Sequence, residues 1–449
     1  MFKISALNPT TKDTAVFFYD PHTSALTDMR GRSVIESTPS FAGAQAVLTT
    51  SKETPNGKVT PRLLKISLGL SCNYECEYCS QRFVPRAVET NPGDISEFLE
   101  AMNNWATEPP ERIEFWGGEP LVYWKTLKPL AEALRTKFPK AEFSIITNGS
   151  LLTKEINNWI VAMGFRVGIS HDGPGQSVRG PDPLEEPKTR EAILSLYRRL
   201  APQNRISFNA MMNRENISRA AVQKFFIELT GDPNVPIGEG TFVDAYDEGG
   251  LASSLKEDET HKYRNTAFRE LRSGMTSNFV TPNNKMIDFI DSIRHQRPSS
   301  VVGQKCGMDQ EGSLAVDLRG NVLTCQNVSS KGMAPNGESH TIGHVSNLSA
   351  VRLNTSTHWS KRDECNKCPV LQLCQGACMF LEGDLWEATC NNAFSDNIVF
   401  FAAAIEYITG FVPMKIEGPH REDRHDIWKA SVKIAEAPKK KIIPIALAA

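Results

Sequence analysis

Ten cysteines fall into two groups, and their spacing constrains this 449-residue chain more than any other feature of it. The first group has the spacing C-x3-C-x2-C and consists of Cys72, Cys76 and Cys79. Three thiolates on one tight loop can hold three irons of a 4Fe-4S cluster and leave the fourth iron without a protein ligand. A structural zinc site would need a fourth ligand, and neither Ser80 nor Arg82 is suitable. We therefore expect a 4Fe-4S cluster with one open iron on this loop.

The other seven cysteines crowd into residues 306–390. The spacing is C-x13-G-x4-C, a gap, C-x2-C-x5-C-x3-C, and a last cysteine after eleven more residues; it comprises Cys306, Gly320, Cys325, Cys365, Cys368, Cys374, Cys378 and Cys390. Such a region would depend on metal in place of a hydrophobic core. A zinc ribbon would account for the four central cysteines but would leave Cys306, Cys325 and Cys390 unexplained.

From residue 63 onward, short apolar runs alternate with longer helical stretches, which predicts alternating strands and helices. We expect strands at 63–70, 112–117, 142–148, 166–170, 205–211 and 236–244. Helices are expected at 96–106, 124–137, 154–163 and 187–199, and an apolar helix at 397–409. Six parallel strands with right-handed crossovers form an open or partly closed barrel, whose chemistry belongs at the carboxyl ends of the strands.

The first cysteine group resembles the motif of radical SAM enzymes, in which an aromatic residue precedes the last cysteine, as Tyr78 does here. In that family the open iron binds S-adenosylmethionine (SAM), which is cleaved to a 5′-deoxyadenosyl radical that abstracts hydrogen from the substrate. The resemblance implies an α/β fold with a partial (β/α)6 barrel, in agreement with the strand count. It covers about residues 63–395.

Further motifs at the predicted strand ends resemble SAM contacts of the same family. The GGEP motif, whose backbone carbonyls and Glu side chain take up the SAM amino group, corresponds to Gly117, Gly118, Glu119 and Pro120. Asn148 and Ser170 resemble contacts to the ribose and carboxylate of SAM. Asp172 either has a direct role in SAM binding or forms an Asx turn before Gly-Pro. Arg179 resembles an arginine that serves the SAM carboxylate or the order of the loop.

The second cysteine group resembles the SPASM domain, a cysteine-rich C-terminal extension of radical SAM enzymes with two auxiliary iron-sulfur clusters. The resemblance implies that auxiliary cluster I is held by Cys306, Cys325 and Cys378, and auxiliary cluster II by Cys365, Cys368, Cys374 and Cys390. With the SAM-binding cluster, it implies three 4Fe-4S clusters. Because cluster I has three cysteines, its fourth iron is either open or held by another residue.

SPASM enzymes mostly modify ribosomally made peptides or proteins, so we expect a radical SAM oxidoreductase that oxidatively cross-links such a peptide. Gln326 stands where sulfatase-maturing relatives have a catalytic carboxylate, which counts against formylglycine formation. Asp317 is a candidate base, with a hairpin carboxylate as the simpler explanation. The alternatives are a dehydrogenase or cofactor-maturation enzyme acting on a small molecule, a formylglycine-type protein maturase, and an electron-transfer or metal-binding scaffold that never cleaves SAM.

Charge and hydropathy exclude other partners. Lys plus Arg is 50 and Asp plus Glu is 52, so the net charge of -2 provides no electrostatic footprint for nucleic acid or an anionic membrane. No apolar run reaches the roughly 20 residues needed to span a bilayer, and the N-terminus lacks a signal-peptide pattern. We predict a cytoplasmic protein. Its expected partners are a precursor peptide, a separate leader-recognition protein, and an electron donor such as flavodoxin or ferredoxin.

Four parts are predicted along the chain. Residues 1–60 form an N-terminal extension with a hairpin at 14–19 and 25–27, followed by a linker at 49–61. Residues 61–300 form the radical SAM barrel, 301–412 the SPASM domain and 413–449 a C-terminal tail.

Overall fold

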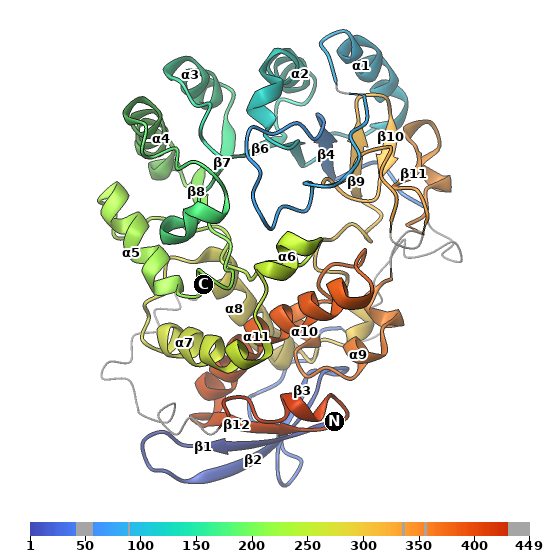
Figure 1. The fold of residues 1–449 in the computed structure, drawn as a ribbon. Coiled ribbons are helices and arrows are strands. Elements are labelled where there is room, and N and C mark those ends of the chain that lie inside the picture. The colour runs from blue at the N-terminus through green and yellow to red at the C-terminus, as the bar shows by residue number, and fades with distance from the viewer. Residues whose placement is uncertain (42–56, 89, 335–336, 354–356, 430–449) are drawn as a thin grey trace.

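Parallel strands form the middle of the larger of two sheets in the computed structural model, which describes residues 1–41, 57–88, 90–334, 337–353 and 357–429. The strand order is β11-β10-β9-β4-β5-β6-β7-β8, and the six strands from β9 to β8 run parallel (Figure 1). The strands are β4 (Leu63–Ser67), β5 (Arg112–Trp116), β6 (Glu142–Thr147), β7 (Phe165–Ser170), β8 (Ile206–Asn209), β9 (Ser313–Asp317), β10 (Asn321–Leu323) and β11 (Thr341–His344). The predicted α/β fold class with a partial barrel is confirmed.

The predicted strand at 236–244 is wrong, although the count of six parallel strands is correct. This segment makes only isolated bridges, such as Phe208 with Ile237, because Pro236 lacks an N–H donor and Gly240 has a φ of +151°. The sixth parallel strand is β9, which pairs with β4. Every residue of β9 is buried, as expected for a strand inside a parallel sheet. The barrel therefore includes a strand from the cysteine-rich region.

Helices cover the outer face of the larger sheet (Figure 1). They are α1 (Asp94–Trp105), α2 (Trp124–Lys137), α3 (Lys154–Ala162), α4 (Pro187–Leu200) and α5 (Arg219–Thr230). The first four lie within two residues of the predicted helices. Their apolar sides pack on outward-facing strand residues such as Phe115, Phe143 and Phe165, which are at most 1% exposed. Because successive side chains of a strand point to opposite faces, the other side chains of each strand point to the concave face of the sheet.

The N-terminal extension forms the second, antiparallel sheet, with the order β12-β1-β2-β3. Its strands are β1 (Phe2–Leu7), β2 (Thr14–Asp20), β3 (Ala25–Asp28) and β12 (Val412–Glu417). The predicted hairpin is β2 and β3. β12 pairs with β1, so the first residues of the predicted tail belong to this sheet because of their alternating apolar side chains. Most of the predicted linker and the tail from residue 430 lie outside the described residues.

The remaining helices lie mainly between the two sheets (Figure 1). They are α6 (Glu248–Ala252), α7 (Thr260–Arg272), α8 (Val280–His295), α9 (Asp363–Asn366), α10 (Leu371–Cys374) and α11 (Gly383–Thr409). The predicted apolar helix at 397–409 is the second half of α11, whose first half carries Cys390. Together with α7, α8 and the smaller sheet, α11 forms a second apolar core. Among the described helices, none is both long enough and apolar enough to cross a membrane.

Candidate active site and cysteine clusters

The loop that follows β4 brings Cys72, Cys76 and Cys79 together. Backbone N–H groups of Tyr74 and Gln81 each lie 3.4 Å from a sulfur, of Cys72 and Cys79 respectively. Burial raises the pKa of the Cys76 thiol to about 11, so a thiolate there needs a cation such as iron to balance its charge. The three thiols and the amide groups directed at them fit the ligand set expected for a 4Fe-4S cluster.

The two glycines of the GGEP motif allow β5 to touch the start of this loop. A Cβ atom at Gly118 would lie 2.5 Å from the carbonyl oxygen of Ser71, and one at Gly117 would lie 3.1 Å from that of Gly69. The backbone N–H of Gly118 donates to Gly69 O at 3.1 Å, and that of Glu119 donates to Ser71 O at 3.0 Å. The glycines are therefore needed for packing against the cysteine loop, whatever contact they make with SAM.

Glu119 joins the ends of β5 and β6. The side chain is 1% exposed. Its Oε1 accepts from Leu121 N–H at 3.0 Å and from the Thr147 hydroxyl at 2.7 Å, and its Oε2 accepts from Asn148 N–H at 2.7 Å. Burial raises the pKa of this carboxyl, and the three donors oppose that shift. Since a carboxylate has about four acceptor sites, Glu119 can still accept one further donor.

Asn148 connects the end of β6 to the cysteine loop. Its Nδ2 donates to Asn73 Oδ1 at 2.9 Å, and its Oδ1 accepts from Ser150 N–H at 3.0 Å. The side chain therefore lies beside the cysteines, where the sequence motif placed it. Ser170, the other predicted contact, ends β7 opposite Asn209 and is half-buried.

Asp172, Tyr78 and Arg179 form one buried network. Tyr78 donates its hydroxyl hydrogen to Asp172 Oδ2. Arg179 Nη1 lies 2.8 Å from the Tyr78 hydroxyl and 3.4 Å from Asp172 Oδ1, which also accepts from Met211 N–H at 2.9 Å. Burial alone would lower the pKa of Arg179, but Tyr78, Asp172 and Cys76 raise it. The Asp172 side chain therefore reaches the cysteine loop rather than forming an Asx turn, and it holds a guanidinium beside Cys76.

Asp317 organises the turn between β9 and β10. Its Oδ1 accepts from the backbone N–H groups of Arg319 at 2.9 Å and Asn321 at 3.1 Å, and its Oδ2 accepts from Asn321 Nδ2 at 2.8 Å. The side chain is buried rather than solvated. These contacts explain the carboxylate without any catalytic role.

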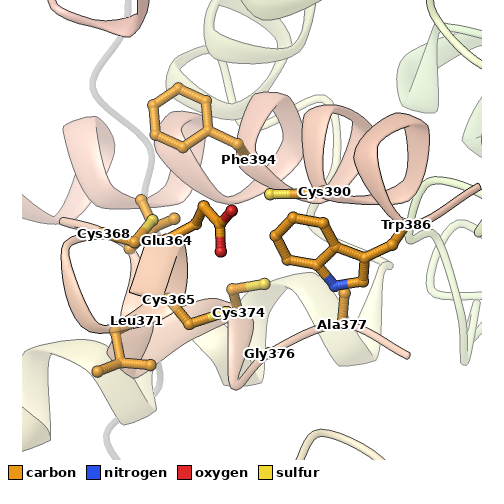
Figure 2. A pocket seen from close by; sticks show the side chains of 11 residues that line it. Glu364, Cys365, Cys368, Leu371, Cys374, Gly376, Ala377, Trp386, Cys390 and Phe394 are labelled. Carbon is orange, nitrogen blue, oxygen red and sulfur yellow. The ribbon is translucent and has the colours of Figure 1, made fainter. Parts of the chain in front are cut away.

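Four cysteines of the second group line a single pocket (Figure 2). These are the residues expected to hold auxiliary cluster II: Cys365, Cys368, Cys374 and Cys390. Trp386 and Phe394 shield the pocket, and the Arg424 guanidinium lies 3.6 Å from Cys390 Sγ. Burial raises the pKa of Cys368 to about 12, so these thiols also need bound metal to ionise.

Cys306, Cys325 and Cys378 come from three separate segments and lie near one another. The pKa of Cys325 is raised to about 12, first by burial and then by Cys306. For Cys378 the pKa is raised by burial, then by Asp244, and then by Cys325 and Cys306. These mutual effects fit the predicted ligands of auxiliary cluster I.

A zinc ribbon, the alternative for the second cysteine group, would bring its ligands around a single ion. In the part of the chain that the structure describes, no three His, Cys, Asp or Glu side chains are grouped to hold a single metal ion. The thiolates of a 4Fe-4S cluster each bind a different iron and stand farther apart than the ligands of one ion. The cysteine groups are therefore compatible with clusters.

The concave face of the sheet lines a cavity of about 780 Å³. Side chains from β5 to β8 make its walls partly polar and partly apolar; they include Glu114, Trp116, Ser144, Ile146, Ser207 and Asn209 and, at the amino ends of the strands, Arg112, Glu142 and Arg166. Lys65 also lies on this side of β4, and sequence reasoning missed it. The available signal was a lysine within the otherwise apolar strand LLKIS.

Comparisons with known proteins agree with this geometry. Residues 66–222 match the model of the radical SAM superfamily. The radical SAM cyclopropyl synthase TigE of Paramaledivibacter caminithermalis is 26% identical over 174 residues, which cover 34% of this chain and 36% of TigE. The serine-type anaerobic sulfatase-maturating enzyme of Klebsiella aerogenes is 23% identical over 348 residues, which cover 72% of this chain and 81% of that enzyme.

One solved structure shows the same fold at low sequence identity. Native anSMEcpe with bound AdoMet and Cp18Cys peptide has a TM-score of 0.53 and 21% identity, and the match covers 78% of this chain and 99% of that one. The match to TigE spans only about a third of that relative's length. Residues 66–222, which carry the cysteine loop and the GGEP motif at the strand ends, therefore form a radical SAM domain.

Proposed function

We propose that this chain is a radical SAM oxidoreductase with three 4Fe-4S clusters that oxidatively modifies a ribosomally synthesised peptide, by cross-linking its side chains. One observation carries the proposal: side chains from the carboxyl ends of β5, β6 and β7 converge on the loop of three cysteines. Glu119, Asn148 and Asp172 each make hydrogen bonds that connect a strand end to that loop or to its neighbour. Such rigid placement suits a reaction that must keep a radical from water.

The cysteine loop is proposed to hold the SAM-binding cluster. Bound SAM supplies, on one-electron reduction, a 5′-deoxyadenosyl radical that abstracts a hydrogen atom from the substrate. Glu119 retains acceptor capacity for the SAM amino group. Asn148 and Ser170 are proposed to contact the ribose and carboxylate, and the Arg179 charge lies beside Cys76.

The concave cavity, with walls that are partly polar and partly apolar, supports a substrate of peptide character. Its volume of about 780 Å³ lies within the range of roughly 300–1,000 Å³ typical of ligand pockets. A protein of the same fold, anSMEcpe, has been solved with AdoMet and a peptide bound. Loss of a hydrogen atom, a proton and an electron oxidises the substrate, and the two auxiliary clusters are proposed to accept that electron. The proposal includes a cytoplasmic location, a low-potential donor such as ferredoxin or flavodoxin, and a separate leader-recognition protein.

The test is to co-express the enzyme anaerobically with each short peptide encoded beside its gene and to measure peptide mass. We expect a loss of two hydrogens per event with the wild type and no change with Cys76→Ala. Fragmentation then locates the modified residues. An unchanged mass, together with no deuterium uptake from heavy water that would indicate epimerisation, would contradict a peptide substrate and favour a small molecule.

A further inference from the structure

Lys65 places a buried positive charge on the concave side of the barrel. Its neighbours Leu64 and Ile66 point into the core beneath the helices, so Lys65 points the opposite way. The side chain is only 7% exposed. Its Nζ lies 3.1 Å from Gln326 Oε1 and 5.8 Å from the centre of the Trp116 ring.

Nothing in the described part of the chain provides Lys65 with a carboxylate at salt-bridge distance; Gln326, its hydrogen-bond partner, is neutral. An isolated buried ammonium is unfavourable, so an anion is expected nearby. Gln326 directly follows Cys325, so this contact places the Lys65 ammonium close to a predicted ligand of auxiliary cluster I. The thiolates of auxiliary cluster I can therefore balance Lys65, as can the carboxylate of Glu114, which is the partner of Lys65 in the register of β4 and β5 but is not within salt-bridge distance.

We propose that Lys65 is a positioning residue that raises the reduction potential of auxiliary cluster I, and that Gln326 orients its ammonium while leaving its charge intact. The inference rests on the proposed function, since it requires that cluster. Reduction makes the cluster more negative by one charge, so a fixed cation nearby stabilises the reduced form more than the oxidised form. Cluster I would then accept the electron left over from substrate oxidation more readily.

Gln326 provides a second, independent test of the same charge. A carboxylate in its place would neutralise Lys65 across the same 3.1 Å contact. The uncharged amide therefore matters to the proposal. Gln326→Glu should lower the reduction potential of auxiliary cluster I, as removal of the ammonium should.

The experiment is a redox titration of the reconstituted holoenzyme followed by electron paramagnetic resonance. The signal that disappears in Cys306→Ala identifies cluster I. We expect a more negative midpoint potential for cluster I in Lys65→Met and in Gln326→Glu, with the potentials of the other two clusters unchanged. Lys65→Arg retains the charge and should keep the wild-type potential. Lys128→Met, which removes an exposed lysine on α2, is the matched control and should have no effect.

An unchanged cluster I potential in Lys65→Met and Gln326→Glu would overturn the inference, as would an equal shift in Lys65→Arg. If Lys65→Met fails to retain iron, the Gln326→Glu result decides alone. Formation of 5′-deoxyadenosine by the wild-type preparation reports separately on the proposed function. If the wild type forms no 5′-deoxyadenosine but the variants still shift the potential of cluster I, the proposed function is refuted and the role of Lys65 is retained.

Discussion

At the scale of single residues, the contacts of Glu119 explain why a carboxylate is needed at the end of β5 even before SAM binds. Both of its oxygens accept hydrogen bonds from protein donors, and the side chain is 1% exposed. Removing an acceptor from such a position leaves a buried donor unpaired, at a cost of about 1–3 kcal/mol.

We predict that Glu119→Gln lowers the free energy of unfolding by about 1–3 kcal/mol, because its amide NH₂ would face one of three N–H or O–H donors. The same change should weaken SAM binding. Chemical denaturation and equilibrium SAM binding measure the two effects. Glu108→Gln is the control, since Glu108 is exposed; equal losses in the two variants would contradict the structural part assigned to Glu119.

The cysteines could be predicted from the sequence because their spacing is local and specific to the chemistry. The Tyr78, Asp172 and Arg179 network could be predicted only in part, because Tyr78 and Arg179 meet across 101 residues of chain. Lys65 was missed for the same reason, since its partner Gln326 lies 261 residues away. Asp317 remains a candidate base beside the simpler hairpin explanation at the level of sequence, because a sequence cannot show that three donors of its own turn already surround it.

At the scale of elements, the helices and the inner strands could be predicted from the periodicity of their apolar residues. The errors arose where strand pairing depends on contacts between distant parts of the chain. The segment 236–244 has strand-like composition, but Pro236, Gly238 and Gly240 interrupt its ladder. β9 joins β4 in parallel from 250 residues away, a pairing that no local pattern encodes.

The β10 and β11 hairpin contains a titratable group that packs against a cysteine segment. His340 Nδ1 lies 2.7 Å from the Thr324 hydroxyl, and Thr324 directly precedes Cys325. Burial lowers the pKa of His340 from 6.5 to about 4. The pKa of His340 is lower in the folded state than in the unfolded state. Neutral His340 therefore makes its full contribution to the free energy of unfolding above pH 6.5, and this contribution is lost as the pH falls toward 4.

We predict that lowering the pH from 7 to 5 costs the wild type about 2 kcal/mol through this histidine, and that His340→Gln removes that component. Denaturant unfolding of both proteins at the two pH values measures it. His344→Gln, at an exposed histidine on β11, should retain the wild-type pH dependence. An identical pH dependence in the wild type and His340→Gln would contradict the assignment.

At the scale of the whole molecule, the barrel and the cysteine-rich region share one sheet, because β9 completes the parallel strands and β10 and β11 extend them. Cys306 precedes β9 and Cys325 follows β10, so the proposed auxiliary cluster I is fixed relative to the concave cavity. The smaller sheet joins both ends of the described chain through β1 and β12. This arrangement supports a function in which radical formation and electron removal occur at fixed separation.

The central claim is that the loop of three cysteines cleaves SAM with help from the strand ends around it. The most direct measurement is 5′-deoxyadenosine formation by the reconstituted protein under anaerobic conditions with a strong reductant, analysed by mass spectrometry. The account predicts formation by the wild type and loss in Cys76→Ala, with the auxiliary clusters still present by iron analysis. Wild-type protein that holds its full complement of iron and forms no 5′-deoxyadenosine would contradict it.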